Sequence, residues 1–599
     1  MRAQRHLAGI FIVIASLLGA AGCVSVPVSG PIEGVEGQQL PCQNCVNVVV
    51  APPAPGDEPK QIVEGYLRAT SNYQPNYSVA RKFLTRMAAE KWSPEGGVSI
   101  YRGSLTATGQ TTVKLKGELV GSLAKDRTYT ARGGRLDTDF SLMQENGEWR
   151  IDTLPPGLFV AEFSFTSFYQ PYDLYFVGNG SSLVPDPIYL PALSNPANAA
   201  SALMKALLNG PSSWLKPAVS TAIPPNTSLS VDSVTITGGI AEVQLSDSVL
   251  ALPDPQRSLM AAQIVYTLKQ VGGVKGVMIK VNQQPYRVPG SDPNGLTIPV
   301  DAIPRDIDPV PFVPGDQLYA APNDGRGLKV VSTAGTSPDV SPLAGPLGRY
   351  TVNALAVSMT STDLAVTTDG ATTLRRAPTA TSEPTATSEQ PRTLLTGATD
   401  LLRPQFTRYG EIWVIGRQGG RQRMWMFTAD KNDPKSAGIK IEINSRVLQN
   451  SNVTAFKISP DGTRMALVRR TTTGQHELGL ARIIRSDKIM VDGLRTLNLG
   501  QTHMPQIGRI ADVAWLDATE LMVLGAADSD SASAPFRVVE DASRITPEGE
   551  PENWDAVQLA VLPRTQTAIV IGRNGDTWKD DGSQWLPFVD HVRTIAYPG

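Results

Sequence analysis

Residues 456–468 read FKISPDGTRMALV: a short apolar stretch, a Ser-Pro-Asp-Gly turn and a second apolar stretch. Two such stretches around a Pro- and Gly-containing turn predict two short strands joined as a hairpin. The arrangement recurs through the C-terminal half of the chain at intervals of 46 to 57 residues. Its five copies are anchored at Ser358, Thr407, Ser459, Leu516 and Leu562.

A repeat of roughly 40–50 residues made of strand, turn and strand is the signature of a propeller blade. Residues 591–597 repeat the first strand but have no hairpin partner after them, and residues 318–331 supply strands that lack a first strand. We expect the two ends to share one blade, because each blade needs neighbours on both faces. The sequence therefore predicts an all-β propeller of six blades over residues 306–599, with seven as the alternative.

Five tryptophans of this region are predicted to fill the blade cores, although one or two of them could instead line a sugar-binding channel mouth. They are Trp413, Trp425, Trp515, Trp578 and Trp585. Asp461-Gly462 is interpreted as a turn and not as a calcium loop. Asn574-Gly575-Asp576-Thr577-Trp578 is interpreted as a turn because its spacing does not fit a sialidase Asp box. A perfect duplication of PTATSE at residues 378–389 is too polar to join a core, and we expect a loop there.

The middle segment, residues 181–305, shows the order helix, strand, strand, helix, strand. We expect helices over 197–208 and around Leu259–Leu268, and strands over 228–236, 240–245 and 277–281, with Gly238-Gly239 as a hairpin turn. This order predicts a compact α+β domain. Three polar residues within it are interpreted as caps and hydrogen-bonding groups: Asp247, Gln263 and Thr267.

The segment at 57–180 begins with apolar residues at helical spacing between Ile62 and Leu67, followed by a second such stretch between Val79 and Ala88. Short alternating strands come next, and Asn146-Gly147 predicts a hairpin between residues 140–143 and 148–151. Helices followed by a hairpin-rich sheet predict an α+β domain. The strand at 147–151, GEWRI, resembles those of NTF2-like domains.

The N-terminus decides the compartment. Arg2 and Arg5 precede an uncharged stretch too short for a bilayer span, which is typical of a signal peptide over residues 1–22. The small residues before Cys23 resemble a bacterial lipobox, in which a peptidase cuts before the Cys and its thiol carries a diacylglyceryl group. Fatty-acyl chains such as palmitate on Cys23 would anchor the chain to the cell membrane on its extracytoplasmic side.

Residues 23–56 are rich in Pro, Gly and polar residues and are interpreted as a tether. Within it lie Cys42 and Cys45, a single CxxC pair. Outside the cytoplasm a local disulfide between them is the favoured interpretation; free thiols and a redox site are the alternatives. A metal site would need two further ligands nearby.

Composition and missing motifs exclude several function classes. The formal net charge of −2 removes the basic surface expected of a nucleic-acid binder. The zincin HExxH, the P-loop and the GxSxG elbow are all missing, and there are only four His and three Cys. We therefore expect no catalytic residues, no metal and no cofactor.

Two resemblances cover most of the mature chain. Four blocks in the middle segment, at 207–211, 221–224, 241–246 and 263–268, resemble GerMN domains of cell-envelope lipoproteins. These blocks, the lipobox, the propeller and the stretch at 62–92 occur together in the actinobacterial LpqB lipoprotein family, which the chain therefore resembles. That resemblance assigns the lipid to Cys23. It also implies a non-catalytic accessory of the MtrA–MtrB two-component system, which acts on the extracellular domain of the sensor histidine kinase and influences envelope homeostasis and division.

Two alternatives remain from the sequence. An envelope lipoprotein that binds cell-wall glycan would place exposed aromatic residues at the propeller mouth or in the GerMN-like groove. A hydrolase or lyase would need carboxylates or histidines that converge in the propeller channel.

Overall fold

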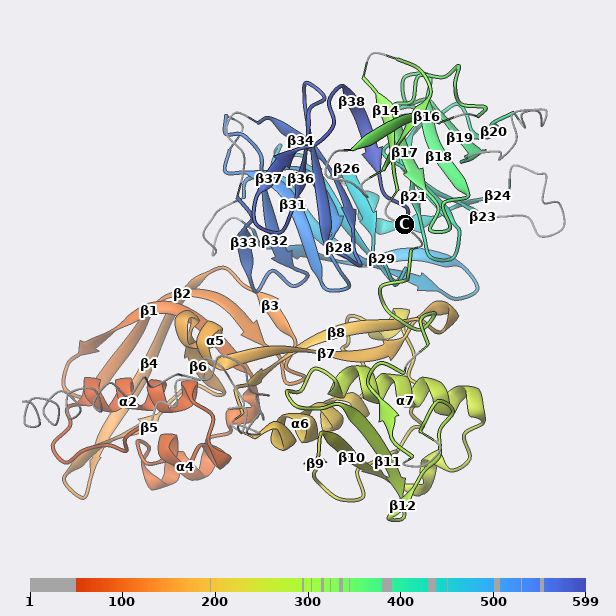
Figure 1. Cartoon of the computed structure of the whole chain (residues 1–599). Helices are drawn as coiled ribbons and strands as arrows, with labels where there is room; N and C mark the ends of the chain where they lie inside the picture. The colour runs from red at the N-terminus through yellow and green to blue at the C-terminus, as the bar shows by residue number, and fades with distance from the viewer. Residues whose placement is uncertain are drawn as a thin grey trace, which may run out of the picture. The chain divides into compact units, whose positions relative to one another are not determined.

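Figure 1 shows the computed structural model of the chain. It describes residues 50–599 apart from residues 194, 293–295, 303, 314–316, 324, 333–337, 344, 380–389, 429–437, 450, 500–506, 529 and 550–553. The predicted signal peptide, Cys23, Cys42, Cys45 and most of the duplicated PTATSE loop lie outside these described residues.

The first domain is a mixed β-sheet with helix α2 (Pro59–Ser71) packed against it. The sheet order is β5-β4-β2-β1-β6, with β3 paired to β2, and only β6 runs parallel to its neighbour. The strands are β1 (Val98–Thr108), β2 (Thr112–Leu123), β3 (Tyr129–Ala131), β4 (Arg135–Glu145), β5 (Glu148–Thr153) and β6 (Leu158–Ala161). This arrangement confirms the α+β class predicted for the segment.

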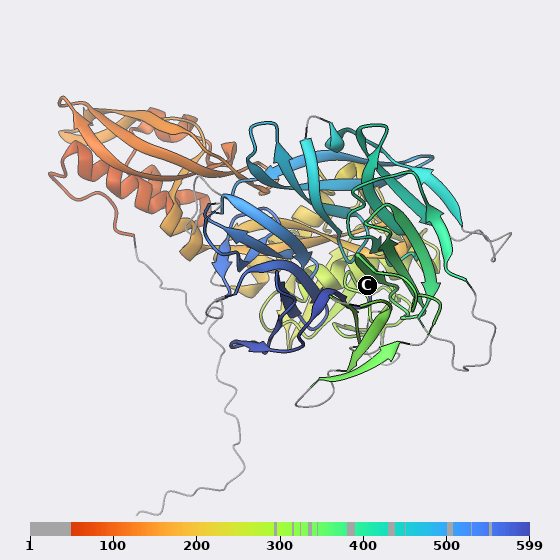
Figure 2. The same ribbon diagram turned by 90° about the horizontal axis from the view of Figure 1, so that it is seen from above.

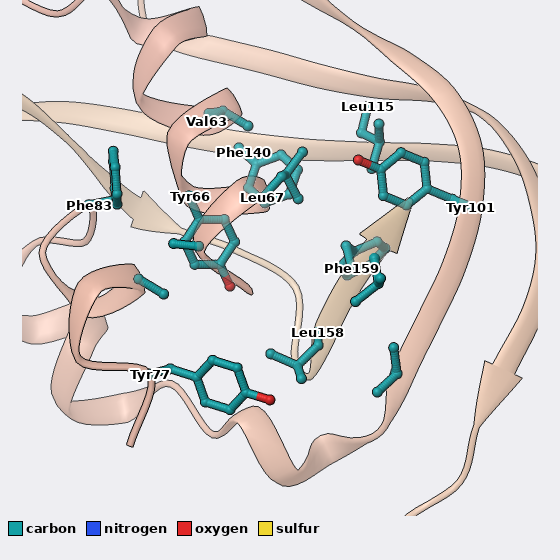
Figure 3. Packing of buried hydrophobic residues seen from close by; sticks show 14 of the residues in the cluster. Val63, Tyr66, Leu67, Tyr77, Phe83, Tyr101, Leu115, Phe140, Leu158 and Phe159 are labelled. Atoms are coloured by element: carbon teal, nitrogen blue, oxygen red, sulfur yellow. The ribbon is translucent and has the colours of Figure 1, made fainter. Parts of the chain in front are cut away.

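Helix α2 buries the face that the sequence pattern predicts. Ile62, Val63, Tyr66 and Leu67 are all buried, and the Tyr66 ring lies 6.1 Å from that of Phe140 on the sheet (Figure 3). Each such side chain contributes roughly 1.5–3 kcal/mol when fully buried. The packing of this face therefore holds the helix on the sheet.

The second helix, predicted as one continuous element, is divided in the structure. The structure has two short helices, α3 (Ser78–Arg81) and α4 (Arg86–Lys91), separated by a turn at residues 82–83 and a β-bridge between Leu84 and Ile151. There the Phe83 carbonyl accepts from the Ile151 N–H at 2.9 Å and the Thr85 N–H donates to the Ile151 carbonyl at 2.9 Å. The chain thus leaves the helix to pair with the edge of strand β5, which helical periodicity alone does not reveal.

The predicted hairpin at Asn146-Gly147 is confirmed. Strands β4 and β5 pair on either side of it, and the two turn residues have φ values of 55° and 80°. Positive φ at both central positions defines the turn that Asn-Gly favours.

A long antiparallel ribbon connects the first two domains. Strands β7 (Tyr169–Val177) and β8 (Leu183–Pro191) pair along their whole length, so the ribbon runs through residue 180, where the sequence pattern placed a domain boundary. Helix α5 (Glu162–Phe168) precedes it. Most of the ribbon's residues are buried, particularly along β8.

The second domain has the predicted element order. Helix α6 (Pro196–Leu208) and helix α7 (Asp254–Leu268) pack together beside strands β10 (Ile240–Leu245) and β11 (Gly276–Val281). Strands β10 and β11 run parallel, joined by α7, and the sheet order is β12-β11-β10-β9. The small outer strands are β12 (Gln284–Pro285) and β13 (Ile298–Pro299).

The strand predicted over 228–236 is interrupted in the structure. Strand β9 covers only Thr235–Thr237, paired to β10 across the predicted Gly238-Gly239 turn. Before it the chain bends at Ser233, whose N–H donates to the Val231 carbonyl at 2.7 Å. Such a three-residue turn interrupts the β-ladder. Before the turn the chain pairs again with the end of β10, where Leu229 bridges Leu245 and the Ser230 N–H donates to the Gln244 carbonyl at 2.9 Å.

The C-terminal region forms six sheets in the described residues, which confirms the six-bladed propeller. The closing blade has the order β16-β15-β14-β38, so the last strand of the chain pairs with the strands that begin the domain. Figures 1 and 2 show the blue C-terminal strands beside the green ones. Its strands are β14 (Leu318–Pro322), β15 (Leu328–Ser332), β16 (Asp339–Leu343) and β38 (Val592–Ala596).

The other five blades follow in chain order, and the third of them contains an additional strand, β25, at its outer edge. The first two are β17 (Ala354–Val357), β18 (Asp363–Thr368), β19 (Thr373–Pro378) and β20 (Arg392–Leu395), then β21 (Gln405–Phe406), β22 (Ile412–Gln418), β23 (Arg421–Thr428) and β24 (Ile439–Glu442). The third is β25 (Asn444–Ser445), β26 (Ser451–Ile458), β27 (Arg464–Thr471), β28 (His476–Arg485) and β29 (Ile489–Leu497). The last two are β30 (Arg509–Trp515), β31 (Glu520–Ala526), β32 (Ala534–Val539) and β33 (Ile545–Pro547), then β34 (Ala556–Leu562), β35 (Thr567–Gly572), β36 (Thr577–Asp580) and β37 (Trp585–Pro587).

The five tryptophans lie in the blade cores as predicted. Trp413 and Trp425 are fully buried, Trp515 and Trp585 are nearly so, and Trp578 packs partly buried against the same cluster as Trp585. None of the described helices is both long and apolar enough to cross a bilayer.

Candidate functional site

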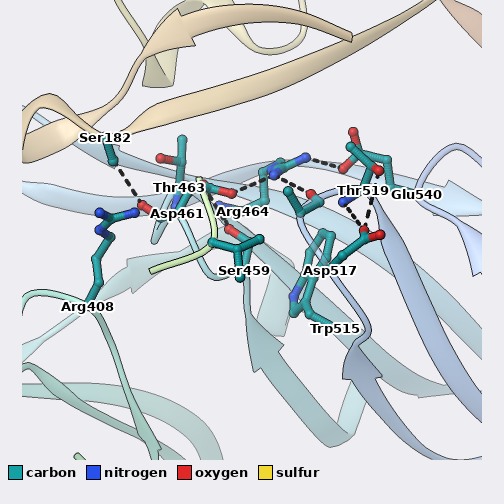
Figure 4. A network of polar contacts seen from close by, with 12 residues as sticks. Ser182, Arg408, Ser459, Asp461, Thr463, Arg464, Trp515, Asp517, Thr519 and Glu540 are labelled. Carbon is teal, nitrogen blue, oxygen red and sulfur yellow. Dashed lines mark hydrogen bonds and ion pairs between the residues drawn. The ribbon is translucent and has the colours of Figure 1, made fainter. Parts of the chain in front are cut away.

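The β7–β8 ribbon contacts one face of the propeller through polar groups (Figure 4). The Tyr409 hydroxyl lies 2.7 Å from the Asn179 carbonyl oxygen and 3.0 Å from that of Asp461. The Ser182 hydroxyl lies 3.4 Å from the same Asp461 oxygen. Tyr409 and Asp461 each occupy the turn between the first two strands of their blades, so the ribbon lies across that face.

Two further sets of contacts tie the second domain and its linker to the propeller. The Trp214 indole donates to the Gly493 carbonyl at 2.5 Å, and the Arg495 guanidinium stacks over the Trp214 ring at 4.8 Å. In the linker, Arg408 donates to the carbonyl oxygens of Asp306 and Asp308 at 2.6 and 2.8 Å. Backbone and side-chain groups of both domains take part in these contacts, which hold the second domain against the propeller.

The most buried charges among the described residues lie at this junction. Asp461 and Arg464 have no exposed surface and Glu540 is 1% exposed. One Arg464 nitrogen lies 2.5 Å from the Asp461 carboxylate and 2.7 Å from the Ala518 carbonyl, and another pairs with Glu540. Burial disfavours the guanidinium cation, but the two carboxylates outweigh it and raise the pKa of Arg464.

The three buried residues Asp461, Arg464 and Glu540 stabilise the fold. The second Asp461 oxygen accepts from the Ser459 hydroxyl at 3.0 Å and from the Thr463 N–H at 2.8 Å. Each carboxylate is therefore already bonded inside the protein, and the trio offers no group to a substrate. The predicted turn at Asp461-Gly462 is confirmed, with Gly462 at φ 78°, but sequence analysis missed the ion pairs that it supports.

One sequence signal could have revealed these charges. In two neighbouring blades a charged residue stands directly before an apolar stretch at the start of the second strand: Arg464 before MALV in β27, and Glu411 before IWVI in β22. Glu411 is also buried, and it pairs with Arg485 at 2.9 Å and accepts from the Trp413 indole at 3.0 Å. A charge at a strand start inside a blade thus indicates a buried ion pair.

The central channel holds a second charged group. Arg403 pairs with Asp512 at 2.7 Å, and Asp512 also accepts from the Leu559 N–H at 2.8 Å. Burial lowers the pKa of the nearby Lys457 amine to about 7, an effect that Arg403 strengthens and Asp512 opposes. The cavity at this mouth measures about 60 Å³ and is bordered by the linker residues Val310 and Pro311. Ligand pockets usually measure about 300–1,000 Å³, so this cavity lies well below that range.

An open groove of about 1100 Å³ lies between the blade of β22–β23 and the blade of β26–β27. We call it the arginine groove. Its lining residues are Arg417, Gly420, Arg421, Gln422, Arg423, Glu442, Ile443, Asn444, Ser445, Leu448, Gln449, Asn452, Arg470, Thr471 and Thr472. None of them is aromatic, and polar side chains dominate.

Two of the three polar residues that were predicted as caps or hydrogen-bonding groups in the second domain form buried hydrogen bonds. The buried Gln263 side chain donates to the Tyr175 carbonyl at 2.7 Å and accepts from the Ala222 N–H at 2.7 Å. Thr267 accepts from the Tyr175 N–H at 3.3 Å. Both join helix α7 to the ribbon strand β7, while Asp247 begins a short 3-10 helix, Asp247–Val249.

The described residues hold no group of three or more His, Cys, Asp or Glu arranged to bind a metal ion. The three predicted cysteine sites, Cys23, Cys42 and Cys45, lie in the part of the chain that the structure does not describe. The lipid site and the disulfide therefore stay predictions.

Asp173, on ribbon strand β7, carries a pH-dependent contribution to stability. Burial raises the pKa of its carboxyl from 3.8 to about 7; Arg464 opposes this, and Asp517, Asp186 and Asp541 add to it. Between pH 3.8 and about 7 the unfolded chain has released this proton while the folded protein still retains it. The stability of the wild-type protein therefore falls as the pH rises through this range. Asp173→Asn is expected to leave stability unchanged near pH 4 and to raise it by about 2 kcal/mol near pH 8.

Thermal unfolding of both proteins at each pH measures this difference. Asp232→Asn is the matched control, because that carboxylate is 91% exposed and should give no pH-dependent change. An equal shift of the Asp173→Asn midpoint at both pH values would contradict the assignment.

Comparison with known proteins identifies the family. The model of the lipoprotein LpqB N-terminal domain matches residues 52–166, a sporulation and spore germination model matches 173–287, and the LpqB β-propeller model matches 330–598. A lipoprotein LpqB of Cutibacterium acnes is 27% identical, and the alignment covers 96% of each chain. One of Thermobifida fusca is 25% identical over 97% of each chain. The chain belongs to the LpqB lipoprotein family, and its three folded parts are the family's N-terminal, GerMN and propeller domains.

Proposed function

We propose that this chain is a lipid-anchored, extracytoplasmic accessory of a two-component sensor kinase of the MtrA–MtrB type, and that it acts by binding and not by catalysis. The observation that carries the binding role is the pairing of its buried charges. Asp461, Arg464 and Glu540 are bonded to one another, and Arg403 is bonded to Asp512. These charges hold the propeller and its junction together, while the open surface is a polar groove suited to a partner.

The proposed anchor gives the binding its strength. Acyl chains on Cys23 contribute about 0.8 kcal/mol for each buried methylene, which keeps the protein at the membrane where the kinase lies. The tether of residues 23–56 then confines the folded domains to a small volume and raises the effective concentration of a weak contact. A change in kinase output requires that one state of the kinase is bound better than the other.

The alternative, a lipoprotein that binds cell-wall glycan, has less support from the geometry. Sugar rings stack on exposed aromatic side chains, and the arginine groove has none among its lining residues. The channel cavity of about 60 Å³ is much smaller than an ordinary ligand pocket. The experiment below separates the two.

Crosslinking in intact cells followed by pull-down tests the proposal. Wild-type protein is expected to recover a sensor kinase, and Cys23→Ala is expected to recover at least roughly tenfold less, because the loss of the anchor lowers the effective concentration. Cys42→Ser is the control, since it removes a cysteine of the same tether and keeps the lipid. Recovery of cell-wall glycan without any kinase would refute the proposal in favour of the alternative.

A further inference from the structure

The arginine groove lies on the propeller face that the ribbon does not contact. Its walls include the β22–β23 turn, at Gly420 and Arg421, and the β27–β28 turn, at Arg470 and Thr471. The ribbon instead contacts the β21–β22 and β26–β27 turns, at Tyr409 and Asp461. Because neighbouring strands in each blade are antiparallel, these two pairs of turns lie at opposite ends of the strands. The groove is therefore open while the second domain stays bound.

The groove concentrates positive charge on a chain whose net charge is −2. Four arginines line it, Arg417, Arg421, Arg423 and Arg470, and the one carboxylate among the lining residues, Glu442, pairs with Arg423. Arg417 lies 3.6 Å from the Asp400 carboxylate, so Arg421 and Arg470 carry most of the charge that the groove offers to a ligand. Arg421 and Arg470 are exposed, one on each wall. Guanidinium groups present planar pairs of donors that match carboxylates in geometry as well as in charge.

Hydrogen bonds across the blade boundary fix the floor of the groove. The Gln422 side chain donates to the Val453 carbonyl at 2.7 Å and accepts from the Val453 N–H at 2.8 Å. Beside it, Arg417 donates to the Asn452 side chain at 2.7 Å. Both contacts join strands of different blades, so the two walls are held at a fixed separation and a ligand need not order them.

We propose that the arginine groove is a docking site for an acidic, extended segment of a protein partner. The mixed lining favours a peptide over a uniformly charged polyanion. A run of phosphates offers only acceptors, whereas a peptide also carries N–H groups that can donate to the side-chain oxygens of Asn444 and Gln449. Ile443 and Leu448 add an apolar patch against which a side chain can pack. The inference that the groove binds the kinase rests on the proposed function. The inference that the groove binds an acidic peptide does not depend on it.

Fluorescence anisotropy with the full-length chain in detergent tests the site. The probe is a fluorescein-labelled peptide of alternating Glu and neutral residues, with its Gln counterpart for comparison. Wild-type protein is expected to bind the Glu peptide in a salt-dependent manner. R421E/R470E is expected to bind it at least about tenfold more weakly, since each reversal replaces an attraction by a repulsion.

R326E/R573E is the matched control. Arg326 lies in the β14–β15 turn and Arg573 in the β35–β36 turn, at the same end of other blades, and both are exposed. This variant changes the net charge equally, so its affinity should stay within about twofold of wild type.

Three results would overturn the proposal: no binding of the Glu peptide, equal losses in both double variants, or groove-dependent binding of inorganic polyphosphate without binding of the peptide. This assay contains no kinase. A wild-type protein that binds the peptide but recovers no kinase from cells would therefore refute the proposed function and leave the peptide site standing.

Discussion

Arg464→Met is expected to destabilise the propeller by about 3–5 kcal/mol. The guanidinium is fully buried, pairs with Asp461 and Glu540 and donates to the Ala518 carbonyl. Its removal leaves two carboxylates with no cation in a site closed to water, and the loss of one partner of a buried pair costs more than the pair itself is worth. Methionine fills similar space, so the expected loss reflects charge and hydrogen bonding more than volume.

The test is thermal unfolding by calorimetry, with the midpoint of the propeller transition as the measured quantity. The control is the triple variant D461N/R464M/E540Q, which removes all three charges and should recover part of the lost stability. Because Asp461 and Arg464 lie beside the Ser182 contact, the ribbon should also become more susceptible to proteolysis in the single variant. If Arg464→Met unfolds at the same midpoint temperature as the wild-type protein, the ion pairs of Arg464 do not stabilise the propeller.

Ile595→Asp is expected to cost at least about 4 kcal/mol, because it removes a buried aliphatic group and places an unpaired carboxylate in a core. Ile595 has no exposed surface and lies on strand β38, opposite Ala320 of β14. It packs in a cluster that also contains Leu562 and Ile569 of the preceding blade. The substitution therefore acts where the last strand closes the ring.

Because the ring closes through this one strand, we expect the loss to spread beyond a single blade. Unfolding should begin at a lower temperature and become less cooperative, as followed by calorimetry and by hydrogen exchange across β14 and β34. Ile595→Val at the same site should cost only about 0.5–1.5 kcal/mol. Unchanged protection of β14 and β34 in Ile595→Asp would contradict closure by β38.

Local and repeated features of the fold were predictable from sequence. The period of the strand pairs identified the blades, and the unpartnered strand at 591–597 located the closure. The Asn146-Gly147 and Gly238-Gly239 turns followed from the φ values that these residues favour. Helix α6 ends at the predicted residue, Leu208, ahead of Asn209-Gly210.

The errors came from tertiary contacts. The helix expected around Val79–Ala88 is broken because the segment at Phe83–Thr85 pairs with Ile151, far away in the sequence. The β7–β8 ribbon was not predicted, since its strands are buried on both faces and show no clean alternation.

The candidate sites were hidden for a related reason. Glu540 meets Arg464 across 76 residues, and only the packing of two blades brings Arg470 beside the three arginines of the β22–β23 hairpin. A single sequence shows that a residue is charged but not which distant charge it faces. The fold was therefore more accessible from sequence than the surfaces that carry function.

The most direct test of an accessory role is the autophosphorylation of an MtrB-type sensor kinase in proteoliposomes, measured with and without the lipidated full-length chain. We expect the chain to change the autophosphorylation rate, R421E/R470E to lose most of that effect, and R326E/R573E to retain it. An autophosphorylation rate and a kinase ligand affinity that are both unchanged by the wild-type chain would contradict the proposed function.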